Sequence, residues 1–263
     1  MYDTNYHKAS SVADASAKLA GADDGKYLAG GQTLIPTMKQ RLAAPSDVID
    51  LGGVSELKGI SAVAGGVKIG AGTTHAEVAG SSAVGGAISS LASHIGDAHV
   101  RHLGTLGGSV ANNDPAADYP AAVLGLGATV HTDKRDIAAD NYFTGMFETA
   151  LDDSEIITAI TFPTAQKAAY AKFPNPASRY AMAGVFVAKM NDGSVRVAVT
   201  GAGSDGVFRH SGMESALAAN WSPGALDGIS VDASGMLGDI HGSAEYRANL
   251  VKVMAKRAVA AAG

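Results

Sequence analysis

The chain contains no cysteine among its 263 residues. Without thiols it cannot form structural disulfides, supply a thiolate nucleophile or hold an iron-sulfur cluster with its own side chains. One-electron chemistry in this protein would therefore require a bound cofactor or another subunit.

Long apolar runs and long basic runs are also missing. No stretch approaches the roughly 20 consecutive apolar residues of a membrane-spanning helix, and Met1 to Thr4 lack the basic and then apolar pattern of an export signal. The formal net charge is −5, which argues against nucleic acid or an anionic membrane surface as a partner. We therefore expect a cytoplasmic protein with no membrane span and no nucleic-acid partner.

Apolar residues are abundant enough for a folded core. They make up 46% of the sequence, whereas charged residues make up 17%, a balance typical of folded domains. The length favours two domains that share an interface. The 33 glycines are spread in short turns between apolar runs, so tight loops are expected.

The first part of the chain has the pattern of a small βαβ-like unit, from residue 1 to about 55. Helical spacing over 11–19 is followed by a short apolar strand at 27–29, which ends at two glycines. A second helical pattern covers 33–41, and 48–51 has the composition of another strand.

The middle of the chain predicts a mixed α+β domain. Short strands are expected at 67–69, 128–131 and 156–162, with helices at 74–79 and 83–95 between them. Three prolines then fall between Phe162 and Pro176, which is typical of a linker or domain boundary.

Beyond this proline-containing stretch the sequence predicts a small sheet packed against helices. Two strands at 183–190 and 195–200 flank Asn191-Asp192-Gly193, a strong hairpin signal. A long helix is predicted at 244–262, with Tyr246, Leu250, Val253 and Met254 on one face.

The first candidate binding motif is Ala29-Gly30-Gly31-Gln32-Thr33-Leu34-Ile35-Pro36, between a strand and a helix. Glycines allow the backbone to curl so that several N–H groups point at one spot, where a phosphate is favoured. The alternative is an ordinary strand-to-helix turn.

The second motif is Gly104-Thr105-Leu106-Gly107-Gly108-Ser109-Val110. Two such turns of similar design could hold the two phosphates of a dinucleotide between them. Asp114, before Pro115, has the position of a helix cap, and Asp118 that of a cap or an acceptor for a ribose hydroxyl.

Three other patterns carry little functional weight. Residues 201–206 satisfy G-x-G-x-x-G, but no long helix follows, so we interpret them as a plain turn. His94, His99 and His102 share no consistent face and have no acidic partner nearby, so no metal site is expected. No serine lies in a G-x-S-x-G elbow, so a hydrolase is not supported.

The two glycine motifs carry a family resemblance. Residues 29–60 resemble the first FAD segment of the medium subunits of carbon monoxide dehydrogenase and related molybdenum hydroxylases, and 99–120 resemble the second. Similarity continues through 141–162 and the helix at 242–258. The family includes the FAD subunits of xanthine dehydrogenases.

This resemblance implies an α+β fold and two domains. Residues 1–165 would form an FAD-binding domain of the vanillyl-alcohol oxidase (PCMH-type) superfamily, with subdomains at about 1–55 and 56–165. Residues 170–263 would form the small C-terminal α+β domain of the carbon monoxide dehydrogenase flavoprotein type, a short antiparallel sheet with helices.

The resemblance also assigns cofactor-binding residues. The pyrophosphate would lie at the two glycine motifs, Asn112 and Asp118 on the ribityl or ribose side, and apolar Ile95 and Ile157 along the flavin. Lys172 falls near a lysine that approaches the flavin in xanthine dehydrogenases, and Tyr180 is a candidate for stacking near the ring. The complete set is Leu28, Ala29, Gly30, Gly31, Gln32, Thr33, Leu34, Ile35, Ile95, Thr105, Gly107, Gly108, Ser109, Asn112, Asp118, Ile157, Lys172 and Tyr180.

The implied function is an oxidoreductase subunit without an acid-base residue of its own, because the flavin carries the redox chemistry. Electrons would arrive from 2Fe-2S clusters of a small partner subunit and leave to an external acceptor. A large subunit with a molybdenum cofactor would oxidise the substrate, in a dimer of heterotrimers. The alternatives are a self-contained flavin-dependent oxidoreductase of the same superfamily and a non-enzymatic module that has lost its flavin.

Overall fold

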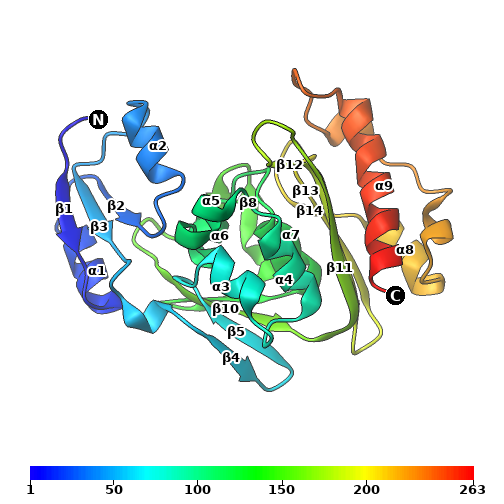
Figure 1. Ribbon diagram of the computed structural model, residues 1–263, viewed down its shortest axis with the longest axis horizontal. Coiled ribbons are helices and arrows are strands. Elements are labelled where there is room, and N and C mark those ends of the chain that lie inside the picture. The colour runs from blue at the N-terminus through cyan, green and yellow to red at the C-terminus, as the bar shows by residue number, and fades with distance from the viewer.

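The computed structural model describes residues 1–263, which form three parts along the long axis of the molecule (Figure 1). An N-terminal unit, a central sheet with helices and a C-terminal sheet with helices follow one another in chain order. This arrangement of helices and mostly antiparallel sheets confirms the predicted α+β class. None of the helices is both long enough and apolar enough to cross a membrane.

The N-terminal unit is a three-stranded parallel sheet in the order β1-β3-β2, with a helix after β1 and another after β2. The predicted elements of the βαβ-like unit are confirmed, and one further strand, β1, precedes them. Strand β1 was not predicted because it is a mostly exposed edge strand of polar residues, without an apolar alternation. The elements are β1 (Asn5–Lys8), α1 (Val12–Ala20), β2 (Gly25–Leu28), α2 (Leu34–Lys39) and β3 (Asp47–Asp50).

The central part is a five-stranded antiparallel sheet in the order β4-β5-β10-β6-β7, with five short helices packed against it and a small β8–β9 hairpin. The predicted strands and the first two helices are confirmed to within about three residues. Helices α5, α6 and α7 were not predicted. The elements are β4 (Ile60–Val63), β5 (Gly66–Gly70), α3 (His75–Gly80), α4 (Gly86–Ser93), α5 (Ala98–Leu103), α6 (Leu106–Asn112), α7 (Tyr119–Leu126), β6 (Thr129–Thr132), β7 (Asp136–Ala138), β8 (Phe143–Gly145), β9 (Glu148–Thr149) and β10 (Ile157–Pro163).

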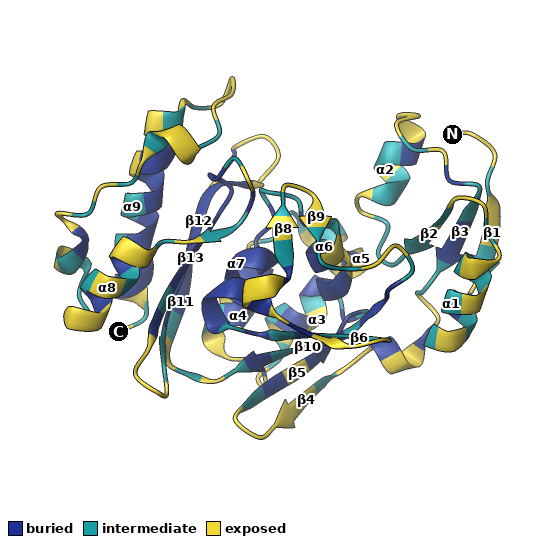
Figure 2. Ribbon diagram, turned by 180° about the vertical axis from the view of Figure 1, so that it is seen from behind, coloured by how far each residue is buried: buried dark blue, intermediate teal, exposed yellow.

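The C-terminal part is a four-stranded antiparallel sheet in the order β11-β12-β13-β14. Helix α7 packs on one face and α9 on the other, so β12 is buried along most of its length (Figure 2). This two-sided burial explains why β12 is a continuous apolar run without alternation. The hairpin at 191–193 and the long final helix are both confirmed. The elements are β11 (Ala165–Pro174), β12 (Ala181–Met190), β13 (Val195–Thr200), β14 (Phe208–Arg209), α8 (Ser211–Ala219) and α9 (Ala244–Ala261).

The predicted linker between Phe162 and Pro176 is wrong, because most of this stretch is strand β11, paired with β12. Its prolines mark strand ends, where a missing N–H is tolerated. Only Thr164 separates β10 from β11. The largest apolar cluster, of 28 buried residues, includes Tyr170 and Phe186 of the C-terminal sheet. The central and C-terminal sheets therefore share one core.

Candidate functional site

The turn after β2 has the donor arrangement predicted for an anion site. The amide N–H groups of residues 29 to 34 donate to no acceptor within the protein. These residues are half-buried or exposed, so their donors are accessible. A run of unpaired amides on a curled backbone favours a phosphate, because the N–H dipoles point to a common region.

Gly31 makes the curl of this turn possible. Its φ is +69°, in the left-handed region that favours glycine. A Cβ there would lie 3.1 Å from Cγ1 of Ile35 and 3.3 Å from Cδ1 of Leu28. The two apolar side chains thus flank the turn, and a larger residue at position 31 would both strain the backbone and crowd them.

The first turn packs directly against the second glycine segment, 74 residues later in the chain. A Cβ on Gly30 would lie 2.0 Å from the carbonyl oxygen of Leu103 and 2.7 Å from Cα of Gly104. A Cβ on Gly108 would lie 3.7 Å from Cβ of Ala29. The predicted juxtaposition of the two glycine segments is therefore present in the structure.

The second segment does not have the predicted design, however. Gly107 and Gly108 lie inside helix α6, and the local N–H groups already have protein acceptors. Leu106 donates to Thr73, Gly107 to Ala71, and Gly108 to the Oγ1 of its N-cap Thr105. Only the first segment is a nest of free amides. Gly107 instead permits close packing, since a Cβ there would lie 2.5 Å from Cβ of Ala71.

Helix α6 contributes side chains in place of amides. Asn112 lies beside both Gly108 and Ser109 on the helix surface, at i,i+4 and i,i+3 spacing, and all three are half-buried or exposed. The Ser109 hydroxyl and the Asn112 carboxamide make no hydrogen bond within the chain. They are available to a polar ligand beside the first turn.

His75 packs against the start of the second glycine segment at Gly104. Its backbone N–H donates to the Gly104 carbonyl at 3.0 Å, and a Cβ on Gly104 would lie 2.6 Å from the His75 ring nitrogen Nε2. Its Nδ1 and the hydroxyl of neighbouring Tyr119 are buried without a partner. Burial, followed by the charge of Arg101, lowers the pKa of His75 to about 4, so the ring is neutral near pH 7.

Residues 94–97, just before α5, contact the buried ion pair between Lys172 and Asp118 through a backbone carbonyl. Arg101 of α5 donates to the carbonyl of Ile95 at 3.0 Å, and the His94 carbonyl accepts from Nζ of Lys172 at 3.1 Å. Lys172 also lies 2.8 Å from Oδ2 of Asp118. Helix α5 has six residues, about 9 Å of rise. Residues 94–104 therefore connect the ion pair to the glycine turns, and we call the region from these turns along residues 94–104 to the ion pair the strip.

Asp118 is not free to accept from a ribose hydroxyl. Its second oxygen, Oδ1, accepts from the Tyr170 hydroxyl at 2.5 Å, and the residue is 4% exposed. Asp114 is not a helix cap: its Oδ1 accepts from Ala116 within a turn, and α7 begins at Tyr119. These pairings could not be predicted from the spacing of the two aspartates alone.

The three remaining predicted residues, Ile95, Ile157 and Tyr180, differ in how far they are exposed. Ile95 is half-buried beside the strip, and Tyr180 is 46% exposed at the β11–β12 loop. Burial and then the charges of Asp114 and Asp118 raise the pKa of Tyr180. Ile157 lies in the central core with 5% exposure, which leaves little of its surface for a ligand.

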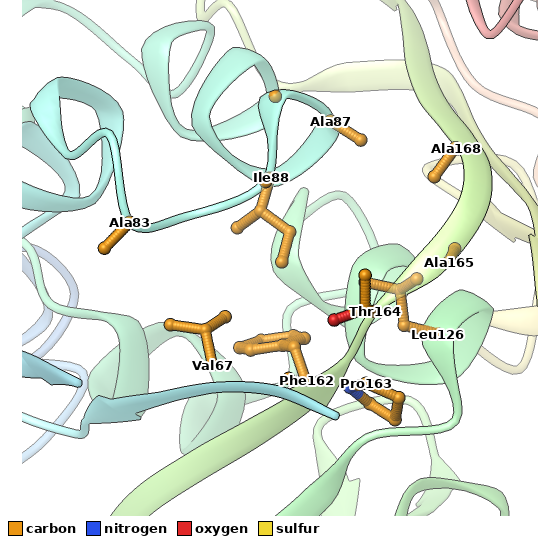
Figure 3. Close-up of a pocket in the computed structure, with 13 residues that line it drawn as sticks. Val67, Ala83, Ala87, Ile88, Leu126, Phe162, Pro163, Thr164, Ala165 and Ala168 are labelled. Carbon is orange, nitrogen blue, oxygen red and sulfur yellow. The ribbon is translucent and has the colours of Figure 1, made fainter. Parts of the chain in front are cut away.

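Two other features lie outside this strip. Residues 201–206 form a turn whose Gly201 N–H donates to the carbonyl of Pro115, in agreement with its interpretation as a plain turn. An apolar cavity of about 280 Å³ lies between β5, α4 and β11 (Figure 3). Its walls share no residue with the glycine turns, and its side chains include Val67, Ile88, Phe162 and Ala168.

A family model that covers more than half of the chain decides the family. Residues 2–165 match the model described as the FAD binding domain in molybdopterin dehydrogenase. The chain belongs to this family. The two glycine segments and α6 all lie within the matched residues.

Full-length relatives agree with this membership. The chain is 36% identical to the nicotine 6-hydroxylase medium subunit of Paenarthrobacter nicotinovorans, over 98% of this chain and 96% of that subunit. It is 33% identical to the carbon monoxide dehydrogenase medium chain of Afipia carboxidovorans, over 97% and 95%. A crystal structure of the cyanide-inactivated Cu,Mo-CO dehydrogenase matches with a TM-score of 0.89 and 32% identity, covering 100% and 98% of the two chains.

These similarities confirm the predicted family and activity class. The protein is an FAD-binding, electron-transferring subunit of an oxidoreductase of the molybdenum hydroxylase type, and FAD is its cofactor. The residues present fit this cofactor, because the free amides of residues 29–34 are suited to a pyrophosphate and the polar face of α6 to hydroxyl groups.

Proposed function

We propose that this chain holds the FAD pyrophosphate with the amides of residues 29–34 and the ribityl hydroxyls with Ser109 and Asn112. Six consecutive N–H groups without a protein acceptor are the observation that carries this proposal. Gly30, Thr105 and Gly108 set the distance between the two walls of the site. Ile95 and Tyr180 border the ring at the far end of the strip.

Bound FAD supplies the electron-accepting and electron-donating chemistry. The chain's own residues fix its position and control its exposure. We propose that the electrons come from 2Fe-2S clusters of a small partner subunit and pass to an external acceptor. A large partner subunit with a molybdenum cofactor would oxidise the substrate, because this chain has neither cysteines nor an evident acid-base pair for that step.

The proposed assembly is a dimer of heterotrimers in the cytoplasm. Within the chain, we propose an FAD-binding domain of residues 1–165 and a C-terminal domain of residues 170–263. The short connection at Thr164 supports this boundary. The shared core across it implies that the two domains unfold together, which a single calorimetric transition would report.

The test is to purify the chain with its neighbouring subunits and record the flavin spectrum and the FAD content. Flavin near one per chain, reduced by substrate only when both partner subunits are present, supports the electron-transfer role. Reduction by an organic substrate in the isolated chain would instead identify a self-contained oxidoreductase. A complete complex without flavin would overturn both the electron-transfer role and the self-contained oxidoreductase.

A further inference from the structure

The N-terminal unit, residues 1–56, is joined to the rest of the chain by few contacts (Figure 1). No backbone hydrogen bond links it to residues 59–263, and none of its strands pairs with a strand of the central sheet. Two side-chain hydrogen bonds of 3.2 Å cross the boundary, from the Tyr27 hydroxyl to the Ser154 carbonyl and from the Ser16 hydroxyl to Oδ2 of Asp133. Hydrogen bonding alone therefore holds the unit in place only weakly.

The apolar core of this unit is also small. Its cluster has six buried residues, whereas the two other clusters of the molecule have 28 and 17. One of the six, Ile156, belongs to the central part, directly before β10, and Tyr27 packs against the same cluster. A sheet of three four-residue strands with so few buried side chains is marginal by itself. The unit therefore depends on its contacts with the central part for its stability.

The proposed FAD site lies at this boundary. The free amides of residues 29–34 belong to the N-terminal unit, whereas Ser109 and Asn112 belong to the central part. The two walls meet where Gly30 packs against Leu103, and no hydrogen bond joins these two residues. A ligand that bonds to both walls would add several hydrogen bonds to a boundary that otherwise has two.

We propose that the N-terminal unit opens as one body when FAD leaves, and that Tyr27 and Ile156 are positioning residues that set how long FAD stays bound. This inference rests on the proposed function, because it requires FAD to contact both walls. Neither residue is among those proposed to hold FAD. A unit with few buried contacts opens at a lower free energy than the whole fold, and a ligand that binds only the closed arrangement reduces the open population by mass action.

Hydrogen exchange of β3 in the assembled complex tests the opening. This strand lies in the middle of the N-terminal sheet, with Val48 and Ile49 both buried, and carries none of the proposed FAD ligands. Without FAD, its amides should exchange faster than those of β12, which is buried along most of its length. FAD at a hundred times its dissociation constant should slow the exchange of β3 about 100-fold.

Two conservative variants weaken the boundary and leave the proposed FAD ligands in place. Tyr27→Phe removes the hydrogen bond to Ser154, and Ile156→Val removes one buried methyl group. Each should raise the FAD dissociation rate about fivefold, and should speed the exchange of β3 in the FAD-free complex by a similar factor.

Ile88→Val is the matched control for these variants. Ile88 and Ile156 are both 3% exposed, but Ile88 packs in the central core. The control should leave both FAD release and β3 exchange unchanged. An equal rise of the FAD dissociation rate in Ile88→Val and Ile156→Val would mean that general stability controls FAD retention, which overturns the inference.

Failure of the inference and failure of the proposed function give different results. One FAD per chain, together with β3 exchange that is as slow as that of β12 without FAD or does not respond to FAD, overturns the inference alone. Unchanged FAD release in both Tyr27→Phe and Ile156→Val has the same meaning. A wild-type complex that binds no FAD would overturn the proposed function itself.

Discussion

Gly30 and Leu103 approach so closely that a single added methyl group on Gly30 would lie 2.0 Å from the Leu103 carbonyl oxygen. This contact joins the N-terminal unit to the central part at the proposed FAD site. Because the obstructing atom belongs to the backbone, no side-chain rotation can relieve the clash. The separation of the two walls of the site therefore depends on glycine at position 30.

Replacing Gly30 with valine should abolish retention of FAD, because the first turn must move away from Leu103 and carry its amides with it. FAD content of the purified complex measures this directly. Gly80→Ala is the matched control, since a Cβ at Gly80 meets nothing within 4 Å. Equal FAD content in both variants would show that the two segments need not touch.

A Cβ on Gly184 would lie 2.2 Å from the Tyr170 hydroxyl, so replacing Gly184 with alanine should displace this hydroxyl from Asp118. The expected cost is about 1–3 kcal/mol of folding free energy, from overpacking in a buried sheet. Denaturant unfolding checks the loss, and Gly228→Ala, with open space at its Cβ, should be close to neutral. Equal unfolding free energies for Gly184→Ala and Gly228→Ala would contradict this prediction.

His75 should make the fold sensitive to mild acid. Its pKa falls from 6.5 to about 4 on folding, so between these values the unfolded chain binds a proton more readily than the folded one. The stability it confers is complete above pH 6.5 and is lost as the pH falls toward 4. Between pH 7 and pH 5 this amounts to about 2 kcal/mol.

Urea unfolding of wild type and His75→Leu at the two pH values tests that difference. Because the buried Nδ1 of His75 has no hydrogen-bond partner, the variant should remain folded. The His75→Leu variant should lose less stability on acidification than the wild type. Carboxylates titrate in both proteins, so their contributions cancel in this comparison. Equal losses in the two proteins would mean that His75 is protonated in the folded state.

Arg247 should be the strongest single polar contributor to the C-terminal part. It is 4% exposed and donates to the carbonyls of Met182 and Gly201 and to Asp239. Arg247→Met leaves two buried carbonyls without donors, which should cost about 3 kcal/mol. Lys256→Met, on the same helix in an exposed pair with Asp227, should cost less than about 1 kcal/mol. Thermal unfolding ranks the two variants, and similar losses would contradict this assignment.

The elements with simple periodicity were predictable from the sequence, and the family followed from the two glycine segments. The first segment behaves as predicted because its backbone alone determines its donors. The second was misjudged because Gly107 allows its helix to pack closely against Ala71, a partner 36 residues away in the chain. Glycine composition does not distinguish a free loop from a closely packed helix.

The partners of Asp118, Tyr170 and Lys172, could not be predicted from the sequence for a similar reason. Interpreting the prolines at 163, 174 and 176 as a linker removed β11 from the predicted sheet. Had the strand been recognised, the i, i+2 spacing of Tyr170 and Lys172 would have placed both side chains on one face. Their pairing with Asp118 still depends on packing between sheets, which a single sequence does not reveal. The supporting roles of His75, Leu103 and Gly184 depend on similar long-range contacts.

The most direct test of the account is amide hydrogen exchange in the assembled complex, compared before and after removal of FAD. If the amides of residues 29–34 bind the pyrophosphate, the peptide covering them should be protected by FAD far more than the peptide covering residues 106–112, whose amides are already bonded within the chain. Equal exchange of residues 29–34 with and without FAD would contradict the central claim that the first turn holds the cofactor.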